Sequence, residues 1–155
     1  MPIFRKIAVI IFFFFSMGKG MSQTAEDSVK RKINQFIMAI NTSNGISIMD
    51  CFADTNSNYQ TIFRGVKGEP EVKYENIREF AHIIGVQPPN FANEVISFDV
   101  VKVDGPLASV WTSYRFYLGG KLHHCGVNSF QLVRLGGGRW KIQYLIDTRH
   151  TDRCQ

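Results

Sequence analysis

Apolar residues recur at helical spacing in two stretches of the first half of the chain, residues 24–41 and 74–84. The apolar positions are Val29, Ile33, Phe36, Ile37 and Ile40 in the first stretch, and Ile77, Phe80, Ala81 and Ile84 in the second. This period predicts two amphipathic helices, each with one face against a core. Between them, residues 46–52 form a shorter helical piece, residues 59–63 have the β-branched and aromatic character of a short strand, and residues 65–70 are expected to form a loop.

The second half of the chain changes to runs of β-type residues. Four such runs occupy residues 94–103, 107–118, 121–135 and 139–147, and short glycine-containing segments separate them. Connections this short join neighbouring strands antiparallel, because parallel strands need a long crossover. The pattern therefore predicts an α+β domain with a curved antiparallel sheet, made of a four-strand meander plus a short early strand, covered by three N-terminal helices.

The register of the second hairpin depends on the glycine pair at residues 119–120. A two-residue loop sets Phe116 opposite His123, whereas a bulged connection shifts the register by one and sets Phe116 opposite His124. We favour the bulged register because it gathers apolar side chains into one continuous face. These side chains are Val110, Tyr114, Phe116, Phe130 and Leu132.

The N-terminus has the pattern of a secretory signal peptide. Arg5 and Lys6 precede an unbroken apolar run, residues 7–15, and the small residues Gly20 and Ser22 suit cleavage before residue 23. A retained membrane anchor is the alternative, but the run is about half of the roughly 20 residues that a spanning helix needs. We therefore predict a signal peptide over residues 1–22, no stable membrane insertion after its removal, and a periplasmic or secreted domain over residues 23–155.

The charge of the chain argues against nucleic acid as a partner. The formal net charge of +5 falls to +2 without residues 1–22, because that segment holds three basic residues and no acid. The tightest basic group of the remaining chain, Lys30-Arg31-Lys32, lies close to Glu26 and Asp27 at a helix start. Such a group is typical of a solvated helix face, whereas a nucleic-acid binder clusters its basic residues on one surface.

Three cysteines, Cys51, Cys125 and Cys154, would reach an oxidising compartment, where a disulfide persists. Three thiols allow three pairings, each with one cysteine left over, and the sequence does not choose between them. A bridge from Cys154 would tie down a C-terminal tail that otherwise frays. The cysteines lack the paired spacing of a metal site, and no glycine-rich loop opens a helix, so we expect neither a metal nor a cofactor.

Three segments together carry a resemblance to a known superfamily. They are residues 49–54 (Met-Asp-Cys-Phe-Ala-Asp), residues 108–111 (Ala-Ser-Val-Trp) and residues 137–142 (Gly-Gly-Arg-Trp-Lys-Ile). In this order along residues 24–149, the chain resembles the nuclear transport factor 2-like superfamily, which includes ketosteroid isomerase, scytalone dehydratase and the SnoaL-like polyketide cyclases. The segments at residues 124–127, 130–134 and 147–149 also resemble a bacterial lumazine-binding-like subgroup.

The resemblance implies a cone-shaped fold whose sheet curls around the helices, leaves a pocket at the open end, and dimerises through its convex face. In the favoured register Trp111, Arg115 and Tyr117 fall on the convex side, and these residue types suit an interface between two copies. The isomerases of the superfamily use a carboxylate base near the first strand and a tyrosine from the first helix. Residues 59–63 contain no acid and residues 24–41 contain no tyrosine, which argues against isomerase chemistry of that kind.

Polar side chains are expected to converge on the open end of the cone. They are Thr112, Tyr114, His124, Asn128 and Tyr144, and an apolar wall with a few polar groups is what a small-molecule site needs. For catalysis, His124 would act as general acid or base, with Asp147 or Tyr114 in support. Simpler roles compete: Tyr114 and Tyr144 can be core aromatics whose hydroxyls reach the surface, and Asp147 can pair with Arg149 near a rim.

The sequence thus predicts an exported domain that binds a small aromatic or planar molecule without naming it. The first alternative is an enzyme of the dehydratase, isomerase or cyclase type that uses His124 with Asp147 or Tyr114. The second alternative is a dimeric association module whose pocket is filled or vestigial.

Overall fold

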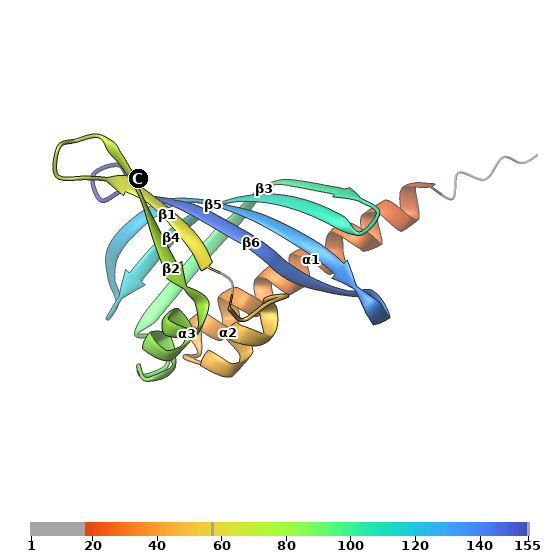
Figure 1. Cartoon of the computed structure of the whole chain (residues 1–155), viewed down its shortest axis with the longest axis horizontal. Coiled ribbons are helices and arrows are strands. Elements are labelled where there is room, and N and C mark those ends of the chain that lie inside the picture. The colour runs from red at the N-terminus through yellow and green to blue at the C-terminus, as the bar shows by residue number, and fades with distance from the viewer. Residues whose placement is uncertain (1–17, 57, 155) are drawn as a thin grey trace, which may run out of the picture.

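The computed structural model describes residues 18–56 and 58–154, which form three helices on one side of a curved six-stranded sheet (Figure 1). The α+β class predicted from the sequence is confirmed. The expected signal peptide, residues 1–22, lies largely outside the described residues and stays a prediction. No helix within the described part of the chain is both long enough and apolar enough to span a bilayer.

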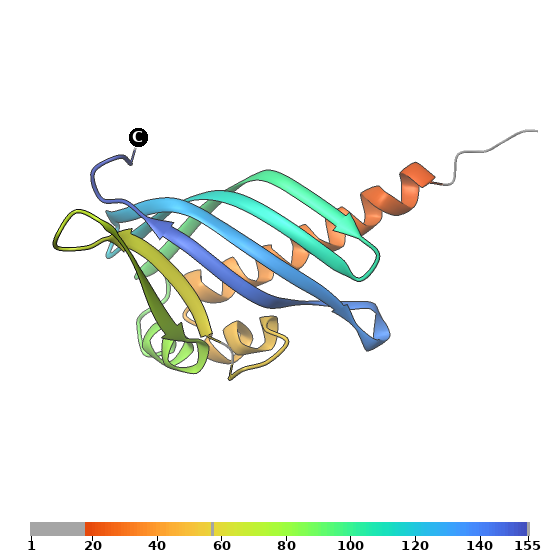
Figure 2. The ribbon, with the colours of Figure 1, turned by 45° about the horizontal axis from the view of Figure 1, so that its top comes forward.

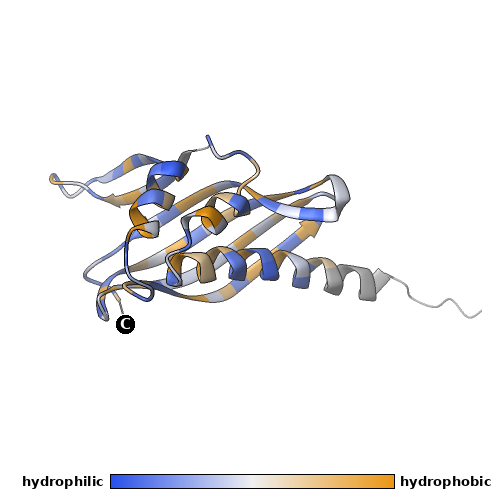
Figure 3. Cartoon of the chain, turned by 90° about the horizontal axis from the view of Figure 1, so that it is seen from below, coloured by the Kyte–Doolittle hydropathy of each residue, from blue (hydrophilic) through white to orange (hydrophobic). Residues whose placement is uncertain are grey.

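The three helices are α1 (Gly18–Asn41), α2 (Gly45–Cys51) and α3 (Ile77–Gly85). The five apolar positions expected along α1 are all buried. Phe36 meets the rings of Phe52 and Phe130 edge-on, at centroid distances of 5.5 and 6.2 Å, and so joins the helical layer to the sheet. Figure 3, drawn from the helical side, shows polar positions along the outward face of α1, as an amphipathic surface helix requires.

The six strands are β1 (Asn58–Arg64), β2 (Pro70–Asn76), β3 (Ala92–Asp104), β4 (Leu107–Leu118), β5 (Lys121–Leu135) and β6 (Arg139–Arg149). Their spatial order is β2-β1-β6-β5-β4-β3 (Figure 2). Strands β3 to β6 form the predicted antiparallel meander, and β1 joins its β6 edge in parallel. The long stretch between β1 and β6, with a helix in it, permits this parallel pairing.

Strand β2 was not expected from the sequence. Residues 65–70 were predicted as a loop and residues 74–84 as a helix, but residues 70–76 pair antiparallel with β1 at the edge of the sheet. In β2, Val72 and Tyr74 alternate with charged Glu71, Lys73 and Glu75, but this alternation is short and most of the strand is exposed, and Tyr74 was assigned to the helix that follows. The helix starts only at Ile77, because the Asn76 side chain caps it by accepting hydrogen bonds from the backbone N–H groups of Arg78 and Glu79.

The β4–β5 hairpin has the favoured register, with Phe116 opposite His124. The shift arises differently from the expectation, because Leu118 pairs with Lys121 across a two-residue turn. The turn is built from two glycines with positive φ, which suits a tight hairpin. His123 is the extra residue of a β-bulge just after the turn, and this bulge moves His124 onto the concave face.

A disulfide joins Cys125 on β5 to Cys154 in the C-terminal tail, which leaves Cys51 as a buried thiol. The tail also continues the backbone pairing of the sheet, because Cys125 and His150 exchange N–H···O bonds of 3.0 and 2.8 Å. Of the three pairings that the sequence left open, the structure therefore has the one that fastens the C-terminus to the middle of the sheet.

Candidate functional site

A cavity of about 320 Å³ lies between the helices and the concave face of the sheet. Its apolar lining comes from Phe36 and Ile40 of α1, Ile77, Phe80, Ile83 and Ile84 of α3, and Phe116, Leu118 and Leu145 of the sheet. Its polar lining comes from Tyr59, Lys73, Glu75, Glu94, Tyr114, His123, His124, Asn128, Asp147 and Arg149. A groove of about 510 Å³ beside the disulfide is larger but opens more widely to solvent. The smaller cavity is the better site because it combines enclosure with buried polar groups.

Glu94 is a buried acid at the start of β3 that lines this cavity. The Asn41 side chain, at the end of α1, bonds both the N–H and the C=O of Glu94 and fixes the start of β3 against the helix. Asn128 Nδ2 donates to Glu94 Oε1 at 2.8 Å. Burial raises the pKa of Glu94 to about 7, although the bond from Asn128 works in the opposite direction. Glu94 therefore exchanges its proton near neutral pH.

A network of alternating charges crosses from β6 to β2 at the same cavity. Arg149 Nε donates to Asp147 Oδ2 at 3.1 Å, and Arg149 Nη1 lies 3.7 Å from Glu75 Oε1. Lys73 Nζ is 3.1 Å from the same Glu75 oxygen, and the Tyr59 hydroxyl donates to Glu75 Oε2. Two cations thus neutralise two carboxylates. The predicted pairing of Asp147 with Arg149 is part of this larger network.

The two acids of the network respond differently to their surroundings. Burial raises the pKa of Asp147 above its ordinary value, and the Arg149 guanidinium only partly offsets this effect. Burial would also raise the pKa of Glu75, but the hydrogen bond from Tyr59 and the charges of Arg149 and Lys73 together lower it. Glu75 is therefore the fixed anion of the network, and Asp147 holds a proton more readily than an exposed aspartate.

His124 lies on the cavity wall between two aromatic rings. It stacks on Phe116 with ring centroids 4.9 Å apart and meets Tyr114 edge-on at 5.6 Å. Its Nδ1 is 2.7 Å from Nδ1 of His123, so one of the two imidazoles donates to the other. Burial, together with the charge of Arg149, lowers the pKa of His124 to about 4. The ring is therefore neutral at pH 7, and a general base with so low a pKa is weak.

The expected pair of His124 and Asp147 does not form in the structure. Asp147 lies opposite Asn128 in the β5–β6 register, four residues along β5 from His124. That separation is about 13 Å along the strand. Tyr114 lies nearer to Asp147, but its hydroxyl donates to the Thr148 carbonyl oxygen at 2.9 Å and is 3.4 Å from Asp147 Oδ2. Burial also raises the pKa of Tyr114, so this phenol keeps its proton.

The structure brings three of the five expected pocket residues to the cavity. Tyr114, His124 and Asn128 line it, whereas Thr112 is buried on the same face without lining it. Tyr144 lies on the opposite face of the sheet, where its hydroxyl donates to Gln60. The reason is a bulge in β6, because the register shifts between its pairs with Gln131 and Leu132 and strict alternation fails there.

Glu94 was missed in the sequence, although it left a signal there. Alternate residues of β3 point inward, and the inward positions at its start are Ala92, Glu94, Ile96 and Phe98. A carboxylate among apolar inward positions is uncommon, because burying an acid costs free energy unless it is compensated. The strand was recognised, but its inward face was not traced as far as its first residues.

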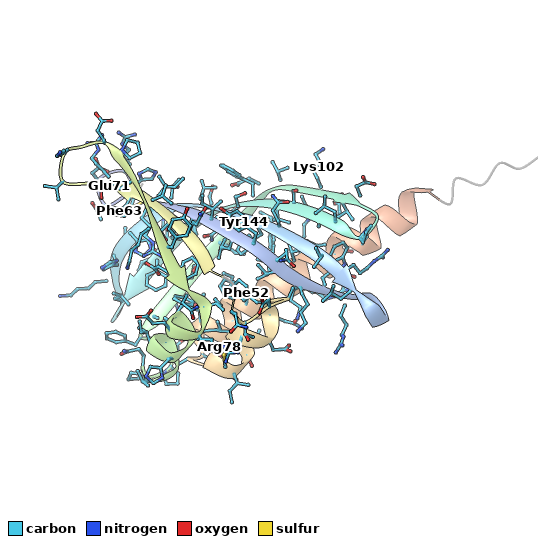
Figure 4. The ribbon with its side chains drawn as sticks, in the orientation of Figure 1. Phe52, Phe63, Glu71, Arg78, Lys102 and Tyr144 are labelled. Atoms are coloured by element: carbon cyan, nitrogen blue, oxygen red, sulfur yellow. A yellow bond between two sulfur atoms is a disulfide. The ribbon has the colours of Figure 1, made fainter. Side chains whose placement is uncertain are left out.

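The convex face of the sheet carries a second, shallower feature. A groove of about 390 Å³ is lined by Val100, Lys102, Ser109, Val110, Trp111, Ser129 and Gln131. Trp111 is 48% exposed there. Figure 4 shows Lys102 on this side of the sheet and Phe52 on the helical side. Within the described residues, no three His, Cys, Asp or Glu side chains are grouped so that they could hold a metal ion.

Comparisons with known proteins identify the fold. No protein-family model matches the chain, and no curated protein matches it. An NTF2-like protein of unknown function from Shewanella baltica superposes with a TM-score of 0.62 at 10% identity, over 84% of this chain and 97% of that one. A domain of unknown function with a cystatin-like fold from Nostoc punctiforme gives 0.61 at 19% identity, over 84% and 80%.

A ketosteroid isomerase-like protein from Erwinia carotovora atroseptica superposes with a TM-score of 0.56 at 10% identity, over 81% of this chain and 96% of that one. These similarities extend over most of each chain, so they concern the whole domain. The chain therefore has the nuclear transport factor 2-like fold, as its sequence resemblance predicted.

Proposed function

We propose that this domain binds one small, mainly apolar molecule in the cavity between α1, α3 and the concave face of the sheet. The observation that carries the proposal is a partly enclosed space of about 320 Å³, with apolar side chains from α1, α3 and the sheet and polar side chains from the sheet. A cavity of this size lies within the range of small-molecule sites, in which a few polar groups orient an otherwise apolar ligand.

The aromatic lining favours a planar ligand. Phe116 and His124 line the cavity as a stacked pair of rings. Tyr59 and Phe80, which also line it, meet edge-on with their ring centroids 5.4 Å apart. Ring-bearing molecules gain from such offset and edge-on contacts beyond the area that they bury.

The place of action and the assembly of the domain are parts of the same proposal. A disulfide between Cys125 and Cys154 fits a periplasmic or secreted protein, because cytosolic thiols are kept reduced. The exposed Trp111 and Arg115 on the convex face fit a homodimer, which would leave the concave cavity free. Light scattering of the wild type and W111E tests this part, and a monomeric wild type would contradict it.

Native mass spectrometry of the purified mature protein tests the binding function. We expect a near-stoichiometric mass increment that disappears on denaturing extraction and gives the chemical class of the ligand. Leu118→Trp fills the cavity from its half-buried rim, so this variant should lose the increment. Leu122→Trp is the matched control, because Leu122 is 44% exposed in the same hairpin and does not line the cavity. Retention of the ligand by L118W would place the binding elsewhere.

A second candidate function is an enzyme that moves a proton on the bound molecule. The observation that favours it is Glu94, whose pKa of about 7 suits both donation and acceptance of a proton at neutral pH. Among solved structures with this fold, the Erwinia protein is called ketosteroid isomerase-like, which is consistent with such chemistry. In this candidate Glu94 replaces His124 as the acid or base, because the imidazole is too weakly basic.

Isotope exchange separates the two functions. The co-purified molecule would be incubated with the wild type and with E94Q in heavy water, and its mass followed over time. Deuterium uptake at carbon with the wild type alone would establish proton transfer by Glu94. Binding without uptake would leave the domain as a binding protein.

A further inference from the structure

Glu94 differs from the other acids of the cavity in having no cationic partner among the described residues. The ion pairs of that part of the chain join Lys73 and Arg149 to Glu75, Arg149 to Asp147, and, outside the cavity, Lys141 to Asp50. Glu94 is only 8% exposed and lines the cavity. The cavity therefore contains one buried carboxyl group that its described lining does not neutralise.

One oxygen of this carboxyl group is open to the cavity. Asn128 bonds Oε1, and no hydrogen bond reaches Oε2 from the described residues. The fully enclosed side-chain oxygens without a partner belong to Thr61, Thr112 and Asp147 and do not include Glu94 Oε2. Glu94 Oε2 thus has no hydrogen-bond partner among the described residues and is not fully buried, so a ligand in the cavity can bind it.

Four donor side chains around the cavity already have acceptors in the protein. The Tyr59 hydroxyl donates to Glu75, and the Tyr114 hydroxyl donates to the Thr148 carbonyl oxygen. Asn128 Nδ2 donates to Glu94 itself, and Arg149 is held by the two carboxylates of the network. Among the described residues, no donor therefore forms a hydrogen bond to Glu94 Oε2, and no cation forms an ion pair with this carboxyl group.

Resting on the proposed binding function, we propose that the ligand carries a protonated nitrogen, which forms an ion pair with Glu94 Oε2 while its ring body fills the apolar part of the cavity. Burying a lone carboxylate is costly, and a cation brought by the ligand offsets that cost. Phe116 lies opposite Glu94 in the β3–β4 register, so an aromatic ring stands beside the same position. An ammonium group is also attracted to the face of an aromatic ring.

The pH response of such a site depends on all charged and titratable groups near Glu94. They are Asp147 and Arg149 of β6, Lys73 and Glu75 of β2, Tyr59 of β1, Tyr114 of β4, and His123 and His124 of β5. Asp147 raises the pKa of Glu94 and Arg149 lowers it, in addition to the larger effect of burial. The α1 and α3 residues that line the cavity are apolar.

Three naphthalene probes that share one ring body test the proposal by calorimetry. They are naphthylmethylamine, which is cationic, naphthylmethanol, which is neutral, and naphthoate, which is anionic. At about pH 8 the amine should bind the wild type at least about tenfold more tightly than the alcohol, with naphthoate the weakest. At about pH 5.5 most of Glu94 is protonated, so the preference for the amine should largely disappear.

Proton release gives a second measurement that needs no variant. At about pH 7, titrations in two buffers of different ionisation enthalpy should show about half a proton released for each amine bound, because the ion pair requires ionised Glu94. E94Q should lose the preference for the amine and still bind the alcohol. E69Q is the control, because Glu69 is an exposed acid between β1 and β2, and it should behave as the wild type does.

The outcomes separate this inference from the function on which it rests. Equal binding of amine and alcohol by the wild type, or an amine preference that survives in E94Q, would overturn the inference and leave the binding function intact. If none of the probes binds the wild type, and L118W and the wild type carry no co-purified molecule, the binding function itself fails. An amine preference that depends on Glu94 and on pH establishes the cationic ligand class.

Discussion

The inward-facing side chains of the sheet differ between its two ends. Near the β3–β4 and β5–β6 turns, the inward-facing side chains are apolar: Ala108, Val110, Leu132, Trp140 and Ile142. Towards the other end of the same strands they become Thr112, Tyr114, His124, Asn128 and Asp147. The first set closes a solid core with α1 and α2, and the second borders or approaches the cavity.

This difference separates stability from binding within one set of strands. Burial of apolar surface at the solid end is the dominant favourable term in folding. At the open end, the Glu94 carboxyl group and the His124 imidazole are buried at a cost. Burial raises the pKa of Glu94 and lowers the pKa of His124, so in both cases it disfavours the charged form. We therefore expect substitutions at the solid end to have the largest effects on stability, and substitutions at the open end to act mainly on binding.

The largest effect is expected where the solid core meets the cavity end, at Phe130. This ring is fully buried and touches Phe36 of α1, so Phe130→Ala leaves a cavity in close-packed surroundings. We expect a loss of about 4 kcal/mol in the free energy of unfolding, measured by urea denaturation. Leu118→Ala, at the half-buried cavity rim, should cost about 1 kcal/mol or less, because its side chain already borders open space. Similar losses in the two variants would remove the distinction between the ends.

The disulfide gives the next largest effect, and it acts at the open end. Cys125 and Cys154 are separated by 29 residues, and a closed loop of that length stabilises the folded state by about 3 to 4 kcal/mol. Cys154→Ser should lower the free energy of unfolding by that amount. Hydrogen exchange should also accelerate at the Cys125 and His150 amides, which pair with each other, while the amides around Ile142 stay protected. Uniform acceleration would show that the tail supports the whole sheet.

Glu94 should make the stability of the open end depend on pH. Its pKa rises from an ordinary value of 4.5 to about 7 in the folded protein, so the folded state holds the proton more tightly than the unfolded chain does. The stability from this group is complete below about pH 4.5 and is lost as the pH rises through about 7. At about 1.4 kcal/mol for each pKa unit, the free energy of unfolding should fall by about 3 kcal/mol by about pH 8.5.

Urea denaturation over a pH series compares the wild type with E94Q for this effect. The amide that E94Q introduces cannot ionise, so this variant should lack that part of the decline and be the more stable protein at about pH 8.5. E69Q should decline with the wild type, because Glu69 is exposed in the described structure. A parallel decline of the wild type and E94Q would mean that Glu94 stays neutral or is solvated.

The solid end was predicted from the sequence better than the open end. Helical spacing placed Val29, Ile33 and Phe36 in the core, and glycine-containing turns defined the meander, because both signals are local and periodic. Strand β2 was missed because its alternation of Val72 and Tyr74 with charged residues is short, and Tyr74 was assigned to the helix that follows. The bulge at His123 was anticipated only as a register shift, since a bulge has no composition of its own.

The candidate site depends on the bulge at His123 and on a contact between β3 and β5, neither of which follows from periodicity. Tyr114, His124 and Asn128 line the cavity on the concave face, and the register of β4 and β5 that puts them there was the favoured one. The link between Glu94 and Asn128 joins residues from two strands that are not neighbours in the sheet. Strand pairing inferred from the sequence concerns adjacent strands, so it could not predict this contact between β3 and β5, which are separated by β4.

The smallest effect concerns the two tyrosines that the sequence placed in one pocket. Tyr144 lies on the convex face and donates to Gln60, whereas Tyr114 lines the cavity with its hydroxyl on the Thr148 carbonyl oxygen. Tyr144→Phe should lower the free energy of unfolding by about 0.5 kcal/mol and leave binding of naphthylmethanol unchanged, because a half-exposed hydrogen bond contributes little. Tyr114→Phe leaves the partly buried Thr148 carbonyl oxygen without this donor, so it should cost about 1 kcal/mol and alter the affinity for the probe. Calorimetry measures the affinity of both variants for naphthylmethanol, and urea denaturation measures their free energies of unfolding. A change of affinity in Y144F would mean that the convex face also contributes to the site.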